Sequence, residues 1–365
     1  MRLALAEIRH EKGRFASIVA SLALITFLVL TLSALSDGLF YGSTGAIRSS
    51  NASAYAFDSQ ASGSLVRSQL PATDVAKFAA QPGVEKASPV GVLLTSGTGP
   101  DGMLDLAVFG VESDGVGVPA SVSQGRLPNA GSNEAAVDSR LTKDGVKLGS
   151  TITVGTTPVT VVGITPDTAY QLQPSLWTSV TNWRAMQEQV RPETRGQNGL
   201  ISAVALQLAK GTEPASVALP NTTVLSSDAT GLAIPGVEQQ RSTLNSIIYT
   251  TILVSAIVVA LFFALLVLEK RELFAALKAL GTSTWKLAKS VIFQAFVASV
   301  LGLVLGIVIS RLVGLVLPAT VPTLFRTEST VSVGIFIVIS GLLGAAFSLR
   351  RIAKIDPATA LGGQL

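Results

Sequence analysis

The chain offers few side chains suited to catalysis. It has no cysteine and one histidine, His10, so thiolate chemistry and a metal site made of several histidines are both excluded. It lacks the GxxxxGK(S/T) loop that cradles nucleotide phosphates, the HExxH metal motif, and a GxSxG motif followed by a usable histidine. Gly97–Gly102 (GTGPDG) is glycine-rich, but no helix is expected after it, so it predicts a turn. We therefore expect no enzyme activity, no intrinsic cofactor and no metal site.

The residues best placed to bind a partner lie between Leu268 and Leu280, in the sequence LEKRELFAALKAL. Leucines recur there at helical spacing, with acidic residues in the first turns and a lysine near the end, as the helix macrodipole favours. The pattern predicts a short amphipathic helix. Two interpretations stay open, a docking surface and an interfacial helix that only caps a helix bundle. The residues that form the pattern are Glu269, Glu272, Leu273, Phe274, Leu277, Lys278 and Leu280.

The composition places this segment in a membrane protein. The chain is 48% hydrophobic and 14% charged, with a mean hydropathy of +0.53, whereas soluble domains carry about 25% charged residues. The formal net charge is +4, and the basic residues gather beside the apolar runs. That distribution indicates that the basic residues face the inner membrane surface and do not bind nucleic acid.

Four apolar runs are long enough to cross a bilayer, since about 20 residues span its hydrocarbon core. We predict them at 15–35, 241–267, 291–317 and 331–349. Basic residues follow the second and fourth runs and precede the first, so the positive-inside rule puts both termini in the cytoplasm. The predicted cytoplasmic parts are an amphipathic helix (1–14), a loop (268–290) and a tail (350–365), and 318–330 forms a short outer loop.

A basic start followed by an apolar run also describes a cleaved signal peptide. The run at 15–35 is longer than a usual signal core, and no clear small-x-small site follows Leu35. We therefore expect a retained first span. Arg311, near the outer end of the third run, is expected to reach the interface with its long side chain.

Residues 36–240 contain no spanning run and are rich in Gly, Ser, Thr, Pro and Asp. They predict a mixed α+β extracytoplasmic domain between the first and second spans of a four-helix membrane protein. Trp177 and Trp183 are expected in its core. The stretch 127–164 should form a helix, a turn at Gly149 and a hairpin. The predicted strands are Pro89–Thr95, Leu104–Val111, Thr151–Val154, Pro158–Ile164 and Ala203–Leu208, and the predicted helices are Ala72–Ala80, Glu134–Thr142 and Val180–Val190.

Small residues in the third and fourth runs predict close helix contacts. Gly302 and Gly306 form a GxxxG pair, and Gly341 and Gly344 lie in the fourth run. Small residues let membrane helices approach closely. We interpret these positions as packing sites within the chain, with dimerisation as the alternative.

One span, a large outer domain and three further spans together resemble the FtsX/MacB (type VII) family of ABC transporter permeases. The segment Leu268–Ile292 is similar to the family's connection between the second and third spans, with Leu280–Gly281 at its turn. The tail RRIAKIDPATALGG (Arg350–Gly363) resembles the family's cytoplasmic end, and 127–164 resembles the core of its outer domain.

The resemblance implies a permease that works as a homodimer with two copies of a separate ATP-binding cassette ATPase, without nucleic acid. The helix at 268–280 would then be the coupling helix that docks in the ATPase. Many members squeeze cargo out of the outer leaflet or move an outside partner, with no hydrated channel. The spans here fit such a mechanism, because they hold almost no ionisable residue. The residues assigned to coupling are Glu269, Arg271, Glu272, Leu273, Leu277, Leu280 and Gly281.

The layout is most similar to the haem (haemin) exporter permeases, which makes haem the expected transported substrate. A haem site needs a flat apolar slot and often a His, Met or Tyr ligand. Phe40, Tyr41 and Tyr249 lie near the outer ends of the first two spans and are the candidates. The tyrosines are also explained as interfacial belt residues. Alternative functions are mechanical control of an extracytoplasmic partner, or efflux of lipid, macrolide or antimicrobial peptide.

Overall fold

The computed structural model describes residues 12–196, 199–269, 271–318 and 321–353. The chain divides into two compact units, one made of Met1–Gly38 with Ser242–Leu365 and the other of Leu39–Arg241. We call them the membrane unit and the α/β unit. Helices α2 (Lys12–Arg48) and α6 (Val237–Glu269) contribute residues to both. The predicted segments at 1–14 and 350–365 lie mostly outside the described residues.

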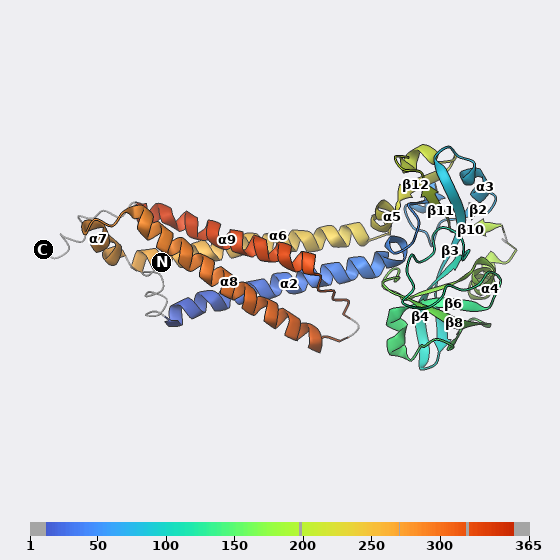
Figure 1. The fold of residues 1–365 in the computed structure, drawn as a ribbon, viewed down its shortest axis with the longest axis horizontal. Coiled ribbons are helices and arrows are strands. Elements are labelled where there is room, and N and C mark those ends of the chain that lie inside the picture. Colours follow the sequence, from blue (N-terminus) through green and yellow to red (C-terminus); the bar gives the residue numbers. More distant parts are fainter. Residues whose placement is uncertain (1–11, 197–198, 270, 319–320, 354–365) are drawn as a thin grey trace. The chain divides into compact units, whose positions relative to one another are not determined.

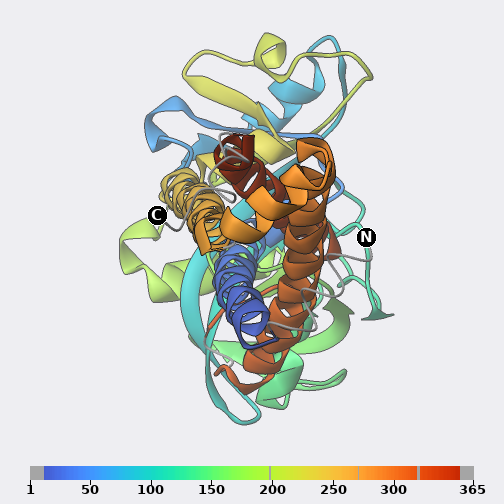
Figure 2. The same ribbon diagram turned by 90° about the vertical axis from the view of Figure 1, so that its left-hand side faces the viewer.

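Four helices in the described part of the chain are long and apolar enough to cross a membrane. They are α2, α6, α8 (Thr284–Val316) and α9 (Thr327–Ala353), and Figures 1 and 2 show them packed alongside one another. The short helix α7 (Arg271–Ala279) joins α6 to α8. Each long helix extends beyond its predicted apolar run, because polar residues continue the helix at its ends. Helix α8, for example, starts at Thr284, where the Ser283 side chain accepts a hydrogen bond from the Lys286 amide.

The small residues of α8 and α9 are packing sites within the chain, as predicted. A Cβ atom on Gly302 would come within 2.6 Å of Leu22 Cβ, and one on Gly306 within 2.6 Å of Thr26 Cβ, so α8 crosses α2 at close range (Figure 1). Gly341 likewise faces Ser299, and a Cβ on Gly344 would lie 2.5 Å from a carbonyl oxygen of α6.

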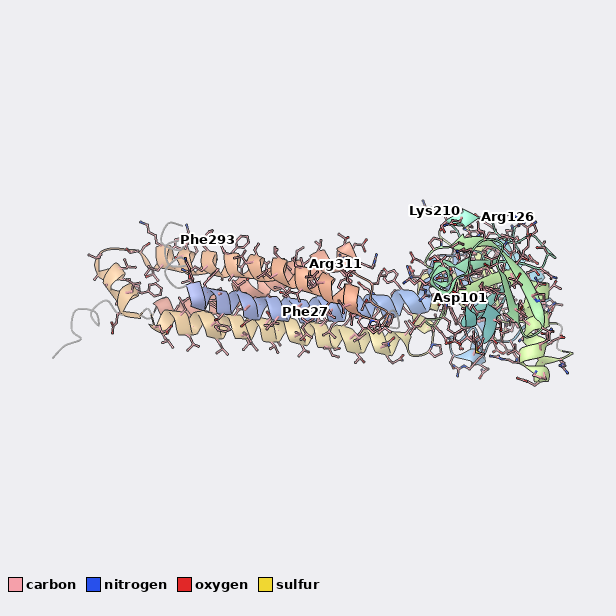
Figure 3. The ribbon with its side chains drawn as sticks, turned by 90° about the horizontal axis from the view of Figure 1, so that it is seen from below. Phe27, Asp101, Arg126, Lys210, Phe293 and Arg311 are labelled. Carbon is pink, nitrogen blue, oxygen red and sulfur yellow. The ribbon has the colours of Figure 1, made fainter. Side chains whose placement is uncertain are left out.

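The connection between α8 and α9 contacts α2 through residues 322–324. The Leu324 amide donates a 2.9 Å hydrogen bond to the Ala34 carbonyl oxygen. A Cβ on Gly38 would overlap the Pro322 carbonyl group, so this crossing requires glycine. Arg311 of α8 (Figure 3) stacks its guanidinium 5.0 Å from the centre of the Phe325 ring.

The α/β unit is built on a mixed sheet in the order β12-β1-β11-β3-β4-β9-β6-β8-β5, with β7 paired to β3 and β8. The long strand β3 joins its two halves, because its first part pairs with β11 and its second part with β4. Pairs β4–β9 and β6–β8 are parallel, and the other pairs of this sheet are antiparallel. The strands are β1 (Ala54–Asp58), β2 (Leu70–Pro71), β3 (Val84–Gly99), β4 (Gly102–Val111), β5 (Gln124–Gly125), β6 (Glu134–Asp138), β7 (Thr151–Val154), β8 (Thr157–Thr165), β9 (Ser175–Ser179), β10 (Leu200–Ile201), β11 (Ala203–Leu208) and β12 (Thr222–Ser226). The helices are α3 (Asp74–Ala79), α4 (Val180–Val190) and α5 (Ser227–Ala233).

One predicted helix is wrong. Residues 134–142 form strand β6 and the start of a 3-10 helix (Ser139–Asp144). The segment EAAVD is buried between β8 and β9, and pairing on both sides decides its conformation over the helix preference of alanine. The predicted turn at Gly97–Gly102 and the β7–β8 hairpin are both present.

Both predicted core tryptophans are buried. The Trp183 side chain of α4 packs against two glycines of the sheet, Gly91 and Gly110. These glycines are paired across β3 and β4. A Cβ atom would lie 2.2 Å from the indole at Gly91 and 2.4 Å from the Trp183 side chain at Gly110. Trp177 stacks on Phe109, with ring centres 4.4 Å apart.

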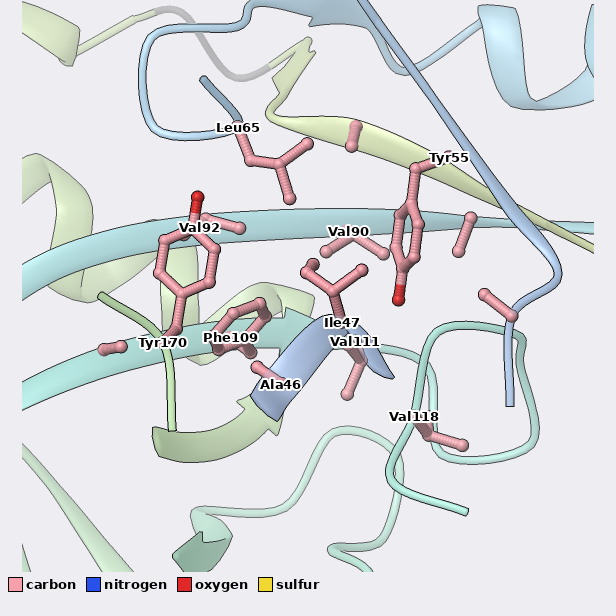
Figure 4. Close-up of a cluster of buried hydrophobic side chains, with 14 of the residues drawn as sticks. Ala46, Ile47, Tyr55, Leu65, Val90, Val92, Phe109, Val111, Val118 and Tyr170 are labelled. Atoms are coloured by element: carbon pink, nitrogen blue, oxygen red, sulfur yellow. The ribbon is translucent and has the colours of Figure 1, made fainter. Parts of the chain in front are cut away.

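The last turns of α2 belong to the core of the α/β unit. The apolar run predicted to end at Leu35 continues as a helix to Arg48, and Ala46 and Ile47 are fully buried. Figure 4 shows Ile47 among the side chains of β3 and β4, which include Val90 and Val111. The helix therefore ends inside the α/β unit, because its last apolar residues complete that core.

Candidate functional site

Helix α7 forms within the predicted coupling segment and ends at the predicted turn. Gly281 has a left-handed φ of 85°. The Gly281 amide bonds to the Lys278 carbonyl oxygen, and the Thr282 amide bonds to the Leu277 carbonyl oxygen. This pair of bonds is a Schellman motif, which favours glycine at the left-handed position. Gly281 therefore sets the sharp turn between α7 and α8.

Leu273 and Leu277 of α7, and Leu280 directly after it, differ in how far they are exposed. Leu273 is 47% exposed and Leu280 is 83% exposed. Leu277 is half-buried and packs against the membrane-unit core together with Phe274, which is fully buried. The three leucines therefore do not form one exposed docking face, because the buried side of α7 holds the helix to the bundle.

The charged residues assigned to this segment remain at its start. Glu269 ends α6, and Glu272 lies in the first turn of α7; both are exposed. Arg271 is the first residue of α7, and its side chain lies outside the described set.

Trp285 is an exposed apolar residue that the sequence analysis did not select. It lies in the first turn of α8, directly after the α7–α8 turn, and is 62% exposed. The Lys289 ammonium lies 5.3 Å from the centre of its ring. An aromatic residue beside a glycine turn, in a loop predicted to be cytoplasmic, was the available sequence signal.

Phe40 and Tyr41 form one aromatic pair, with ring centres 5.4 Å apart and planes at 86°. Two arginines stack on this pair. The Arg48 guanidinium carbon lies 3.9 Å from the centre of the Tyr41 ring, and the Arg241 guanidinium carbon lies 4.3 Å from the centre of the Phe40 ring. All four residues belong to the α/β unit. Sequence reasoning missed both arginines, although Arg48 lies two helical turns after Tyr41.

The third haem candidate, Tyr249, belongs to the membrane unit. It lies on α6 and is 62% exposed. The structure therefore brings Phe40 and Tyr41 together and leaves Tyr249 on the surface of a different unit.

A loop of the α/β unit, residues 166–174, holds the end of α2, and we call it the clasp loop. The Ala46 amide donates a 2.8 Å hydrogen bond to the Ala169 carbonyl oxygen. In return, the Gln171 and Leu172 amides each donate a 3.0 Å hydrogen bond to a carbonyl oxygen of α2. Non-glycine residues rarely adopt positive φ angles, yet Asp167, Gln171 and Leu172 have values of 53°, 49° and 69°. The clasp loop thus holds an unfavourable backbone conformation while it binds α2.

A buried polar network supports the clasp loop. Asp138 is fully buried and accepts hydrogen bonds from the Thr168 amide (2.8 Å) and the Thr168 hydroxyl (3.1 Å). Its other carboxylate oxygen accepts from the Arg140 amide (2.9 Å) and Nε (3.2 Å). The Ser175 hydroxyl donates to Thr168, and the Trp177 indole donates to Ser175, each at 2.7 Å. The network therefore ties the loop to the core tryptophan.

The membrane unit carries an apolar hollow between α6 and α9, with a volume of about 330 Å³. Its walls contain alanines of α6 and the exposed ring of Phe347 on α9. A hollow with apolar walls suits a hydrocarbon chain or another apolar group. The lining residues are Ala256, Ile257, Ala260, Leu261, Ala264, Leu343, Gly344 and Phe347. Within the described residues, no group of three or more His, Cys, Asp or Glu side chains is placed to hold a metal ion.

Comparison with known proteins covers both units. Residues 16–218 match the MacB-like periplasmic core domain, and residues 245–357 match the C-terminal domain of FtsX-like permeases. An uncharacterized ABC transporter permease of Mycobacterium tuberculosis (strain ATCC 25618 / H37Rv) is 27% identical over 99% of both chains. A putative hemin transport system permease protein, HrtB, of Staphylococcus epidermidis (strain RP62A) is 26% identical over 67% of both chains.

A solved structure, the periplasmic region of MacB from Actinobacillus actinomycetemcomitans, is 14% identical to this chain. It aligns with a TM-score of 0.37 and covers 50% of this chain and 92% of that one. The two family matches together take in most of α2, most of the α/β unit and the greater part of the last three membrane helices. The chain is a membrane protein that belongs to the FtsX/MacB family of ABC transporter permeases and leaves ATP hydrolysis to a partner subunit.

Proposed function

We propose that this permease exports a hydrophobic or amphiphilic molecule, with haem as the first candidate. The observation that carries the proposal is the aromatic pair Phe40–Tyr41, which offers flat apolar surface and one phenol oxygen on a helix that emerges from the bilayer. The apolar hollow between α6 and α9 supports an apolar cargo. The similarity to a putative hemin transport permease supports haem in particular.

A haem titration of the purified chain tests the cargo. Haem bound near an oxygen ligand changes its Soret absorption, so we expect a saturable spectral shift and greater haem sensitivity in a strain that lacks the gene. An unchanged spectrum together with normal haem tolerance would reject haem. Increased sensitivity of the same strain to macrolides or antimicrobial peptides would then point to those cargoes.

Energy for export would come from two ATPase subunits bound to a permease homodimer. In this proposal both termini and α7 lie in the cytoplasm, and the exposed side of α7 contacts the ATPase. Leu273, Leu280 and Trp285 supply exposed apolar surface there, and such residues are the usual anchors of an interface. Purification of the permease with its ATPase, followed by cross-linking from Leu280→Cys, tests this contact.

A second function is mechanical control of an extracytoplasmic partner. The clasp loop supports it, because hydrogen bonds from this loop fix the end of α2 in the α/β unit. A movement of α2 would then be passed to the sheet. Recovery of a stable partner whose activity depends on ATP turnover by the complex would favour this function over export.

A further inference from the structure

Arg311 places a permanent positive charge on the apolar part of α8 (Figure 3). Its side chain is exposed. Within the part of the chain that the structure describes, its guanidinium has one partner, the Phe325 ring, whose centre lies 5.0 Å away. The sequence that connects α8 to α9 contains no acidic residue. The described residues therefore supply an aromatic surface for this cation and no counter-charge.

The acidic side chains of the neighbouring helices have other partners. Helices α2 and α9 contain one acidic residue each, Asp37 and Glu328. Glu328 forms a 2.7 Å ion pair with Arg326. Asp37 accepts a hydrogen bond from the Ser329 hydroxyl. The two carboxylates thus stabilise the start of α9 and do not neutralise Arg311.

Arg311 lies one hydrocarbon thickness from the lysine at the other end of α8. About 33 Å of helix separates Lys289 from Arg311, at 1.5 Å per residue, and the hydrocarbon core of a bilayer is about 30 Å thick. No charged residue lies between them. The two cations therefore bracket one bilayer core, and Arg311 reaches the phosphate level of the leaflet remote from α7.

The face of α8 that carries Arg311 is otherwise apolar. Val304, Val308 and Leu315 lie seven residues before, three residues before and four residues after it, so all four side chains share one side of the helix. The three apolar side chains are exposed. Such a stripe suits acyl chains, with the guanidinium above them at the level of the headgroups.

The Phe325 ring holds the guanidinium in a fixed place. A Cβ atom on Gly314 would come within 2.6 Å of this ring, so the ring packs directly on α8. The hydrogen bond from the Leu324 amide to Ala34 anchors the backbone beside it. The ring contacts the flat face of the guanidinium, whereas the N–H donors lie in its plane. A planar fork of donors matches two oxygens of a phosphate group.

We propose that Arg311 and Phe325 bind the phosphate group of an anionic phospholipid in the leaflet remote from α7. Charge complementarity selects an anionic lipid, because a zwitterionic headgroup carries an ammonium group of its own that competes for the phosphate. The acyl chains of the lipid would lie along Val304 and Val308. The inference is independent of the exported cargo, because it concerns other residues and the membrane itself.

The test measures phospholipid binding by the full chain in detergent. Phosphatidylglycerol and phosphatidylcholine with the same acyl chains are titrated separately, and the bound lipid is counted by native mass spectrometry. We expect the unaltered chain to bind phosphatidylglycerol more tightly. Arg311→Gln should weaken that binding about fivefold, as the contribution of one basic residue beside anionic lipid implies, and should change phosphatidylcholine binding much less.

Two further variants separate charge from geometry. Arg311→Lys keeps the charge and loses the planar fork, and Phe325→Leu keeps the arginine and loses the ring, so each should weaken phosphatidylglycerol binding less than Arg311→Gln does. Arg195→Gln, at an exposed arginine of the α/β unit, is the control and should bind both lipids as the unaltered chain does. Thermal unfolding checks that each variant is folded. If Arg311→Gln does not fold, the Arg311→Lys and Phe325→Leu variants decide.

Three results would overturn the inference. The first is equal affinity of the unaltered chain and the folded Arg311 variants for phosphatidylglycerol. The second is displacement of phosphatidylglycerol by inorganic phosphate, which would identify a site for a free anion. The third is loss of a dimeric species in Arg311→Gln with lipid affinity intact, which would assign this cation to a contact between two copies of the chain.

Discussion

The backbone amide of Ala46 donates a 2.8 Å hydrogen bond to the carbonyl oxygen of Ala169. The Gly42 carbonyl oxygen, four residues earlier in α2, accepts a hydrogen bond from the Leu172 amide. The clasp loop thus exchanges backbone hydrogen bonds with α2. The last turns of this helix are part of the α/β unit by hydrogen bonding as well as by packing.

Gly45→Ala tests the clasp. A Cβ atom at this position would lie 2.5 Å from the Asp167 carbonyl oxygen and 2.9 Å from that of Ala169. Because these are backbone atoms, the loop must move, and we expect a destabilisation of about 1–3 kcal/mol. The measurement is the midpoint of thermal unfolding of the purified chain, which should fall by about 2–4 °C per kcal/mol.

Gly13→Ala is the matched control in the same helix. Among the described residues, a Cβ on Gly13 would meet nothing within 4 Å beyond its own helix backbone, so alanine should be neutral or should stabilise the helix by up to about 1 kcal/mol. Equal unfolding midpoints for the Gly13 and Gly45 variants would contradict the proposed tightness of the clasp.

Asp138→Asn should also destabilise the clasp loop, because Asp138 accepts hydrogen bonds from Thr168 of that loop. The asparagine keeps one acceptor oxygen, but its NH₂ group cannot accept the hydrogen bonds that either Thr168 or Arg140 donates. We expect a loss of about 2–4 kcal/mol in the free energy of unfolding, since charged hydrogen bonds contribute about 1.5–3 kcal/mol each. A shift in tryptophan emission should accompany it, because the network ends at the indole of Trp177. An unshifted emission spectrum with unchanged stability would show that the network has little effect.

Glu134 makes the stability of the α/β unit depend on acidity. The hydrogen bonds that Glu134 accepts, first from Arg126 and then from the Asn129 amide, lower its pKa from 4.5 to about 2. Between pH 2 and 4.5 the unfolded chain therefore binds more protons than the folded chain. The stability that this carboxylate contributes is complete above about pH 5 and is lost as pH falls through 2.

The measurement is the unfolding midpoint of the unaltered chain and of Glu134→Gln across pH 7 to 2. The difference between the two proteins should be constant at neutral pH and should shrink below pH 4.5. A difference that stays constant down to pH 2 would mean that the Arg126 pair does not stabilise the fold.

The exposed and buried leucines of α7 should respond differently to a charge. Leu273→Asp and Leu280→Asp should leave the fold intact and weaken ATPase binding by roughly 2 kcal/mol, about 30-fold, if the exposed face is the docking surface. Leu277→Asp should instead lower stability, because its half-buried side chain packs against the core of the membrane unit. Co-purification of the ATPase and ATP-driven transport are the readouts. Leu148→Asp, at a leucine 45% exposed on the α/β unit, is the control. Normal coupling in both exposed-face variants would reject the docking assignment.

The spacing of apolar residues predicted the helices and strands whose buried face follows a regular helix or strand repeat. The helix Val180–Val190 and the strands Thr151–Val154 and Ala203–Leu208 appear with the predicted bounds, because their apolar spacing matches the face that is buried. The segment at 134–142 failed, because alanine and valine there suit either conformation and strand pairing decides.

The candidate site was less predictable for a related reason. Tyr41 and Arg241 are separated by the whole α/β unit in the sequence, and only the fold brings Arg241 to the neighbouring Phe40 ring. The partial burial of Leu277 could not be predicted from the sequence either. Helical spacing shows which residues share one side of a helix, but it does not show which other element packs against that side.

The close contact between Leu22 and Gly302 sets an order of events during synthesis. The ribosome must add 280 residues between these two positions, which takes on the order of ten seconds to a minute at about 5–20 residues per second. During that interval α2 lies in the bilayer without its partner helix, which the apolar composition of α2 allows. The whole of residues 39–241 emerges in the same interval. The nascent chain can therefore secure Ala46 and Ile47 in their core before the helix bundle exists.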